Sequence, residues 1–141
     1  MAQRMTRSMA WEYFEHPLTD AQTGEKGELV CIDTATGLLF MSAAGTATLR
    51  PIGTLDNGNG ITTGDGVTKV RVKLFREIWV HWFANDAAGT PVVAADVGSL
   101  CYLFDKRTVT GASAGNSTAG RVWGIHPLYG VGVEMLGFFA Q

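Results

Sequence analysis

The sequence predicts an all-β protein, a compact β-sandwich or barrel-like domain, from three observations. Its 18 glycines punctuate short runs rich in Val, Ile, Leu, Phe, Trp and Thr, which is typical of short strands joined by turns. No window of ordinary helix length combines a 3.6-residue apolar period with capping residues. Hydrophobic residues make up 46% of the 141 residues and charged residues 17%, so one domain of this length has enough apolar side chains for a core.

The predicted strands follow one another at short intervals. Residues 28–33 and 38–42 form a hairpin around the turn TATG. Residues 67–83 form the longest apolar run, in which Arg71 and Lys73 alternate with apolar residues, so that one face is buried and the other is wet. A change of phase near residues 75–77 indicates a bulge. The other predicted elements are strands at 48–55, 91–93, 100–105, 106–110, 121–126 and 131–136 and one helical turn at 94–97.

The pattern of strands recurs within the chain, which indicates an internal duplication. Both copies read strand, turn, strand, loop, strand, as expected for a repeated supersecondary unit. The alternative is chance similarity within Gly-rich β sequence. The matching positions, each pair 71 residues apart, are Gly27 and Gly98, Arg50 and Arg121, and Gly53 and Gly124.

The two ends differ from the middle of the chain. Residues 1–25 show no strand alternation and are predicted to be an extended N-terminal arm before a single β domain at residues 26–141. The arm is either a frayed end packed back on the domain or a segment that becomes ordered on a neighbouring subunit. Aromatic side chains at both ends are costly to leave in water. The candidate contact residues are Arg4, Arg7, Trp11, Tyr13, Phe14, Trp82, Phe138 and Phe139.

Composition argues against several classes of function. The net charge is −2 and no run of Lys or Arg occurs, so we expect no nucleic-acid partner. No segment has the length of a membrane span and no signal peptide is recognisable, so we expect a protein made in the cytoplasm with no membrane partner. Cys31 and Cys101 have no paired spacing and are expected to be buried free thiols, the alternative being a disulfide between them. No metal or other cofactor is expected.

Two motifs have only a superficial likeness to functional sites. The string GASAG around Ser113 fits the hydrolase nucleophile elbow, but the residues after it cannot start a helix and no Asp or Glu lies between Ser113 and His126. The loop DNGNGITTGDG lacks the spacing and the closing Glu of a calcium loop. His16, His81 and His126 are far apart in sequence and have no Cys or carboxylate pair at metal-ligand spacing. The chain is therefore not expected to be an enzyme.

Aromatic residues are the remaining candidates for a functional surface. They are either a platform for sugars or, as the sequence favours, part of a core or of a protein interface. These residues are Trp79, Trp82, Phe83, Tyr102 and Trp123.

The segments VRVKLFREIWVHWFAND, AADVGSLCYLFDKRTVT, AGRVWGI and VGVEML, in that order, resemble the capsid decoration (cement) proteins of tailed bacteriophages. The resemblance covers about residues 27–135. It departs from the family at Asp105-Lys106-Arg107, where relatives are more acidic, and at the longer ends. It implies a virion protein on the outer capsid surface, commonly a homotrimer, that binds the major capsid protein, stabilises the shell and has no catalytic residues. The alternative is a receptor- or glycan-binding β module.

Overall fold

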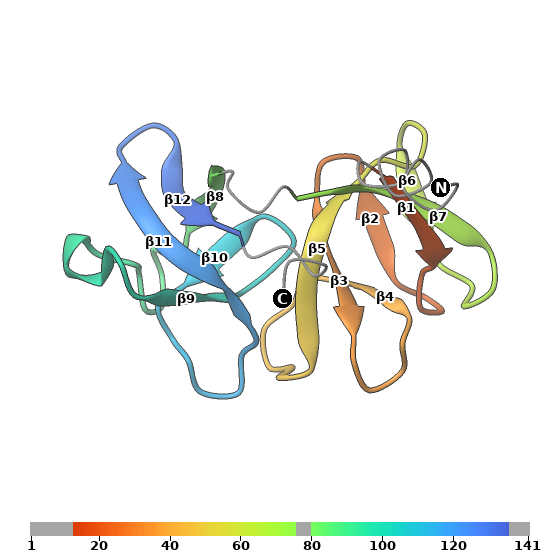
Figure 1. Ribbon diagram of the computed structural model, residues 1–141, viewed down its shortest axis with the longest axis horizontal. Helices are drawn as coiled ribbons and strands as arrows, with labels where there is room; N and C mark the ends of the chain where they lie inside the picture. Colours follow the sequence, from red (N-terminus) through yellow and green to blue (C-terminus); the bar gives the residue numbers. More distant parts are fainter. Residues whose placement is uncertain (1–12, 76–79, 136–141) are drawn as a thin grey trace, which may run out of the picture.

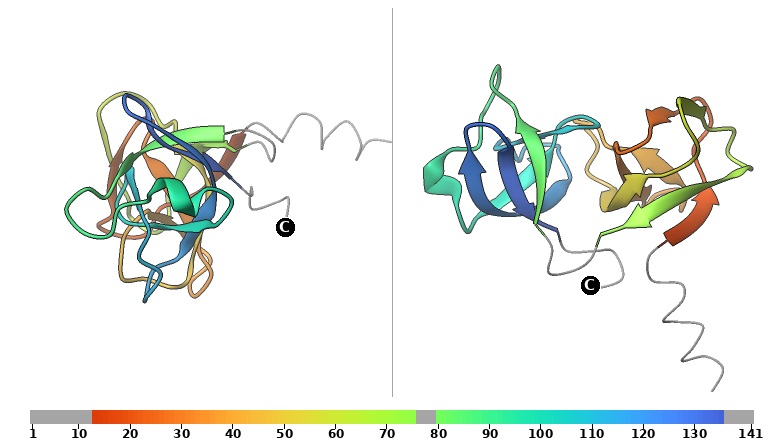
Figure 2. Two further views of the ribbon diagram at one scale, coloured as in Figure 1. Left: turned by 90° about the vertical axis from the view of Figure 1, so that its left-hand side faces the viewer. Right: turned by 90° about the horizontal axis from the view of Figure 1, so that it is seen from above.

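The computed structural model describes residues 13–75 and 80–135, which form two β lobes that lie side by side (Figures 1 and 2). The all-β prediction is confirmed, and the predicted helical turn is a single 3₁₀ turn, η1 (Ala94–Asp96). Lobe 1 contains β1 (Tyr13–Pro17), β2 (Thr23–Glu25), β3 (Leu29–Asp33), β4 (Leu39–Met41), β5 (Leu49–Leu55), β6 (Ile61–Thr63) and β7 (Lys69–Leu74). Lobe 2 contains β8 (Val80–Asn85), β9 (Leu100–Leu103), β10 (Thr108–Thr110), β11 (Thr118–His126) and β12 (Gly130–Glu134).

The two lobes have the same strand order, which confirms the internal duplication. In lobe 1 the order is β1-β7-β5-β3-β4, and a parallel bridge from Leu18 to Leu39 links its two ends. In lobe 2 the order is β8-β12-β11-β9-β10, and β10 pairs in parallel with β8 to close the barrel. Strands β1, β3, β4, β5 and β7 therefore correspond to β8, β9, β10, β11 and β12.

Identical backbone hydrogen bonds mark the start of each repeat. The N–H of Gly27 donates to the carbonyl of Leu55 at 2.8 Å, and that of Gly98 donates to the carbonyl of Val122 at 2.9 Å. The N–H groups of Leu55 and Val122 donate back, both at 2.8 Å, to the residue after each glycine. The two glycines have φ of 92° and 90°, in the left-handed region that other residues rarely adopt. Leu55 is thus the equivalent of Val122.

The structure corrects the alignment within β5 and β11. The true partner of Gly53 is Gly120, because a Cβ on either would lie within 2.6 Å of a carbonyl oxygen of the neighbouring strand. Gly124, which the constant spacing selects, has open space at that position. The pairing of Arg50 with Arg121 is wrong for the same reason. The loops of the two repeats differ in length and β11 carries a bulge, so one spacing cannot hold throughout.

The lobes share part of their core. One cluster lies within lobe 1 and includes Leu18, Leu55 and Val72. The larger cluster combines lobe 2 side chains with four lobe 1 side chains, and it also buries the two free cysteines. The joint apolar cluster keeps the lobes in contact. The lobe 1 members of this larger cluster are Leu29, Cys31, Leu49 and Phe75.

Three predicted boundaries are wrong. Residues 1–25 are not all an arm, because residues 13–17 form β1, paired antiparallel with β7, and residues 23–25 form β2, paired with β6. The start predicted for the domain, residue 26, is too late, because β1 belongs to the five-stranded sheet of lobe 1, which lies beside the closed barrel of lobe 2. The run 67–83 contains two strands of different lobes, β7 and β8. Residues 76–79, where most of the predicted bulge falls, lie outside the described residues.

The short strand predicted at residues 91–93 is also absent from the structure, which shows irregular backbone there. The side chain of Asn85 provides hydrogen-bond partners for the backbone of this segment instead. Its amide donates to the Val92 carbonyl and accepts from the Val92 N–H, both at 2.8 Å. These two side-chain hydrogen bonds take the place of the backbone hydrogen bonds that a strand would form with its neighbour.

Candidate functional site

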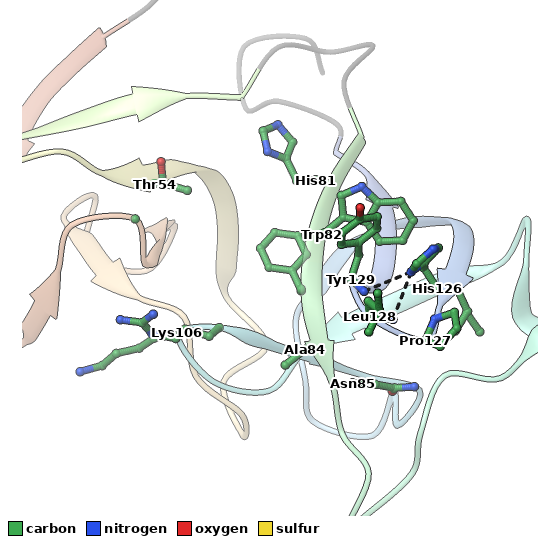
Figure 3. Close-up of a pocket in the computed structure, with 15 residues that line it drawn as sticks. Thr54, His81, Trp82, Ala84, Asn85, Lys106, His126, Pro127, Leu128 and Tyr129 are labelled. Carbon is green, nitrogen blue, oxygen red and sulfur yellow. Dashed lines mark hydrogen bonds between the residues drawn. The ribbon is translucent and has the colours of Figure 1, made fainter.

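Four neighbouring aromatic side chains lie at the surface of lobe 2; we call Trp82, Trp123, His126 and Tyr129 the aromatic cluster. Figure 3 shows Trp82, His126 and Tyr129. Ring centroids of Trp82 and Trp123 are 6.1 Å apart at 88°, and those of Trp82 and Tyr129 are 5.7 Å apart. His126 stacks on Tyr129 at 4.3 Å. Trp82 is 38% exposed, Trp123 58% and Tyr129 61%. Large aromatic side chains with this much contact to water are unusual unless a partner covers them.

The backbone of lobe 2 is shaped around this cluster. Trp82 on β8 lies opposite Gly132 on β12, and a Cβ on Gly132 would approach the indole ring to 2.9 Å. The glycine therefore leaves room for the indole to lie across the strand. In the turn after β11, Nδ1 of His126 accepts the N–H groups of Leu128 at 3.1 Å and Tyr129 at 3.3 Å. This bond pair fixes the turn and presents Leu128, which is 84% exposed.

A groove of about 810 Å³ runs beside the cluster, toward lobe 1 (Figure 3). Its lobe 1 side includes Gly27 and Thr54, and the turn after β9 adds Arg107. The guanidinium of Arg107 donates to Glu28 at 3.0 Å and to Glu25 at 3.1 Å. The hydrogen bond to Glu28, followed by its charge and that of Glu25, raises the pKa of Arg107. The groove therefore has one aromatic wall and one ion-paired wall.

Trp82, Gly132 and Trp123 lie next to one another on the paired strands β8, β12 and β11, and we call such a set of neighbours a row. The matched glycines identify the equivalent row of lobe 1. Gly53 faces the carbonyl of Lys73, and Gly120 faces that of Glu134, so β7 and β12 align with Arg71 at the place of Gly132. On the next strand, Glu15 lies opposite Arg71 as Trp82 lies opposite Gly132. On the other side, Asp56 follows Leu55 and Trp123 follows its equivalent Val122. The bulge of β11 lies here, so Trp123 and Gly124 share the place opposite Gly132 that Asp56 has opposite Arg71. The equivalent positions are thus Glu15 and Trp82, Arg71 and Gly132, and Asp56 and Trp123.

This row is ionic in lobe 1. The Arg71 guanidinium lies 3.4 Å from the Asp56 carboxylate and stacks 3.8 Å from the ring of Tyr13. The same positions of one fold therefore carry charged groups in one copy and two indoles in the other. Folding of the barrel does not require aromatic residues at these positions.

The predicted contact residues that the structure describes lie in different surroundings. Trp82 lies in the aromatic cluster. Tyr13 is 36% exposed on β1, whereas Phe14 on the same strand is partly buried and packs against the lobe 1 core; both remain predicted contact residues. The other candidates lie outside the described residues and comprise Arg4, Arg7, Trp11, Phe138 and Phe139.

Sequence reasoning missed Leu128 and Tyr129 and did not place them beside Trp82 and Trp123. Their signal is the turn HPLYG, in which two large apolar residues occupy positions where turns usually carry small or polar residues. Such a turn indicates an exposed contact.

The two weak motifs belong to loops. Ser113 is exposed between β10 and β11 and precedes a strand, whereas a nucleophile elbow precedes a helix. Asp65 closes its own turn by accepting from Thr68 and Val67, and these bonds, that from the Thr68 hydroxyl first, lower its pKa to about 2. The His81 ring meets the Phe75 ring edge to face at 4.4 Å, and burial lowers the pKa of His81.

Two further searches cover the part of the chain that the structure describes. Residues 13–75 and 80–135 contain no group of three or more His, Cys, Asp or Glu side chains placed to hold a metal ion. Within the same ranges no helix has the length and apolar character needed to span a bilayer.

Comparisons with protein-family models, with curated proteins and with solved structures find no match to this chain.

Proposed function

We propose that this chain is a structural virion protein that binds the outside of an icosahedral phage head, stabilises its shell and docks through the aromatic cluster of lobe 2. The observation that supports docking is the contrast between equivalent rows, indoles in lobe 2 and ion-paired groups in lobe 1. The resemblance of the strand segments to capsid decoration proteins supplies the head as the partner. The partners are the major capsid protein and further copies of the chain, as a homotrimer.

The energetics of the cluster favour a binding role. Exposed apolar surface costs about 25 cal/mol per Å² relative to burial, and polar residues at the same positions of lobe 1 avoid that cost. Trp and Tyr dominate the few residues that carry most of the energy in protein interfaces. Leu128, at the tip of a turn that His126 fixes, adds an ordered apolar contact at little conformational cost.

The shape of the cluster favours a protein partner over a sugar. The two indoles meet at 88°, and His126 covers one face of the Tyr129 ring. The cluster is therefore a raised apolar surface with Leu128 beside it, and not a row of parallel open ring faces. Multiple copies on one shell would bind with high avidity, and binding across capsid subunits would stabilise the assembled state.

The test is binding to expanded heads that lack the decoration protein. We expect the wild-type chain to bind and Trp123→Ala to bind at least tenfold more weakly, since interface hot spots contribute about 2 kcal/mol or more. The matched control Ile61→Ala changes an exposed apolar side chain of lobe 1 that lies outside the aromatic cluster and is expected to bind as the wild type does. Heads that do not bind the wild-type chain would refute the capsid assignment. Equal binding of all variants would refute docking through the aromatic cluster.

Glycan binding is tested in parallel on a glycan array. A signal that Trp82→Ala abolishes would replace the capsid proposal with the glycan-binding module, whereas no signal is expected. Light scattering on the purified chain measures the oligomer, and a trimer is expected.

A further inference from the structure

A second surface of unusual character covers the outer side of lobe 1; we call Lys26, Lys69, Arg71 and Lys73 the cationic face. Strand β7 contributes three of the four, at alternate and exposed positions. Alternate residues of a strand lie about 6.8 Å apart on one face. The chain has 11 Lys and Arg residues and a net charge of −2, and four of those cations belong to this one face.

The charge of this face is only partly neutralised. The Asp56 carboxylate serves two cations at once, with Lys26 at 3.5 Å and Arg71 at 3.4 Å. Lys69 and Lys73 form no ion pair with any residue in the described ranges 13–75 and 80–135. Two carboxylates, those of Asp56 and of the cross-strand neighbour Glu15, therefore stand against four cations. The surplus attracts an anion, to the extent that salt does not screen it.

The barrel itself does not need these cations. The equivalent positions of β12 are Gly130, Gly132 and Glu134, and lobe 2 folds with no positive charge on that strand. Nor do the lysines protect a free sheet edge, which is a common reason for lysine on a strand, because β7 lies between β1 and β5. The cations are thus specific to the surface of lobe 1.

Two features suit this face to an extended acidic chain. The Tyr13 ring holds the Arg71 guanidinium at 3.8 Å, which orders the central cation of the three on β7. An extended peptide presents alternate side chains at the same spacing as a strand. The geometry points to a second docking site: the cationic face of lobe 1 binds an extended, carboxylate-rich segment of a partner protein.

This inference goes beyond the proposed function, because it concerns the other barrel and a different chemistry. A chain with one aromatic and one cationic contact surface bridges two partner surfaces, which strengthens retention when both are engaged. A nucleic acid is the other polyanion to consider. The sequence pI of about 5.8 disfavours it.

The experiment measures fluorescence anisotropy of a labelled eight-residue peptide that alternates Glu with Ser, with the full chain as titrant at low salt. We expect binding that weakens as salt rises, and no binding of the same peptide with Gln in place of Glu. The double variant Lys69→Glu, Lys73→Glu is expected to bind at least tenfold more weakly. The matched control Arg50→Glu, Arg121→Glu makes the same change in net charge away from the face and is expected to bind within twofold of the wild type.

The inference is overturned if both double variants lose binding equally, if the Gln peptide binds as well as the Glu peptide, or if a single-stranded DNA octamer binds more tightly than either. Thermal unfolding confirms that each variant is folded, which we expect since the substituted side chains are on the surface. Trp123→Ala is expected to keep peptide binding, so failure of this inference and failure of the head-binding proposal give different results.

Discussion

The alignment of the two barrels predicts which glycines tolerate a methyl group. A Cβ on Gly53 would lie 2.1 Å from the carbonyl oxygen of Lys73, and a Cβ on Gly120 would lie 2.6 Å from that of Glu134. These neighbours are backbone atoms, so Gly53→Ala and Gly120→Ala must push two paired strands apart. Gly124→Ala is the matched control, because its Cβ would meet no atom within 4 Å.

The expected magnitudes follow from these contacts. Overpacking typically costs about 1–3 kcal/mol, and a displaced ladder hydrogen bond adds about 1 kcal/mol. Alanine also lowers the conformational entropy of the unfolded chain, which stabilises the folded state by about 0.5 kcal/mol. We expect losses of about 3 kcal/mol for Gly53→Ala and about 2 kcal/mol for Gly120→Ala, and almost no loss for Gly124→Ala. The unfolding entropy of a chain this long is about 0.3 kcal/mol/K, so the first loss lowers Tm by about 10 °C.

The assay is urea unfolding followed by tryptophan fluorescence, with thermal unfolding by circular dichroism as a second probe. The reasoning is refuted if Gly124→Ala destabilises the chain as much as Gly120→Ala. The register of β11 would then be wrong, and Trp123 would lose its equivalence to Asp56. The contrast between the two rows, on which the docking proposal rests, would be lost with it.

Three further predictions concern single side chains. Asn85→Ala removes two 2.8 Å hydrogen bonds to the following loop and is expected to lower the free energy of unfolding by about 2 kcal/mol in urea titrations; a change under 0.5 kcal/mol would contradict this. Hydrogen bonds from Thr68 lower the pKa of Asp65 to about 2, so this carboxylate stabilises its turn above about pH 4 and the effect disappears as pH falls through about 2; a carboxyl NMR titration with a midpoint at 3.8 would disagree. Burial raises the pKa of Cys101 to about 11, so a thiol reagent at pH 8 should label it only after unfolding, and rapid labelling of the native chain would count against the buried position.

The fold was predictable where the apolar pattern is local. The hairpin of β3 and β4 and the wet face of β7 follow from alternation and turn residues. Strand β1 was missed because its alternation is weak, with Tyr13 outward, Phe14 only partly buried and His16 bonded to the Gly37 carbonyl. The boundary between β7 and β8 was missed because the apolar run continues through it, and only tertiary packing assigns the strands to different barrels.

The site was predictable only in part. Trp82 was identified from its place in an aromatic strand, whereas its grouping with Trp123 and Tyr129 depends on the pairing of β8, β12 and β11. Pairing partners far apart in sequence leave no local signal. The constant spacing of 71 residues located the repeat but not its register, because the loops of the two copies differ in length. Equivalence of Asp56 and Trp123 therefore required the hydrogen bonds and glycine contacts.

Comparison of the two copies distinguishes residues that the fold requires from residues that give each lobe its own surface. Equivalent core positions remain apolar and buried in both copies, as with Leu55 and Val122, and with their cross-strand partners Val72 and Val133. The outward rows differ in kind, although both copies must satisfy the same strand order. Aromatic docking and cationic docking would compete for one outward row of a single barrel. Two lobes can hold both, and under the two docking proposals one chain would bridge an apolar and an acidic contact on its partners.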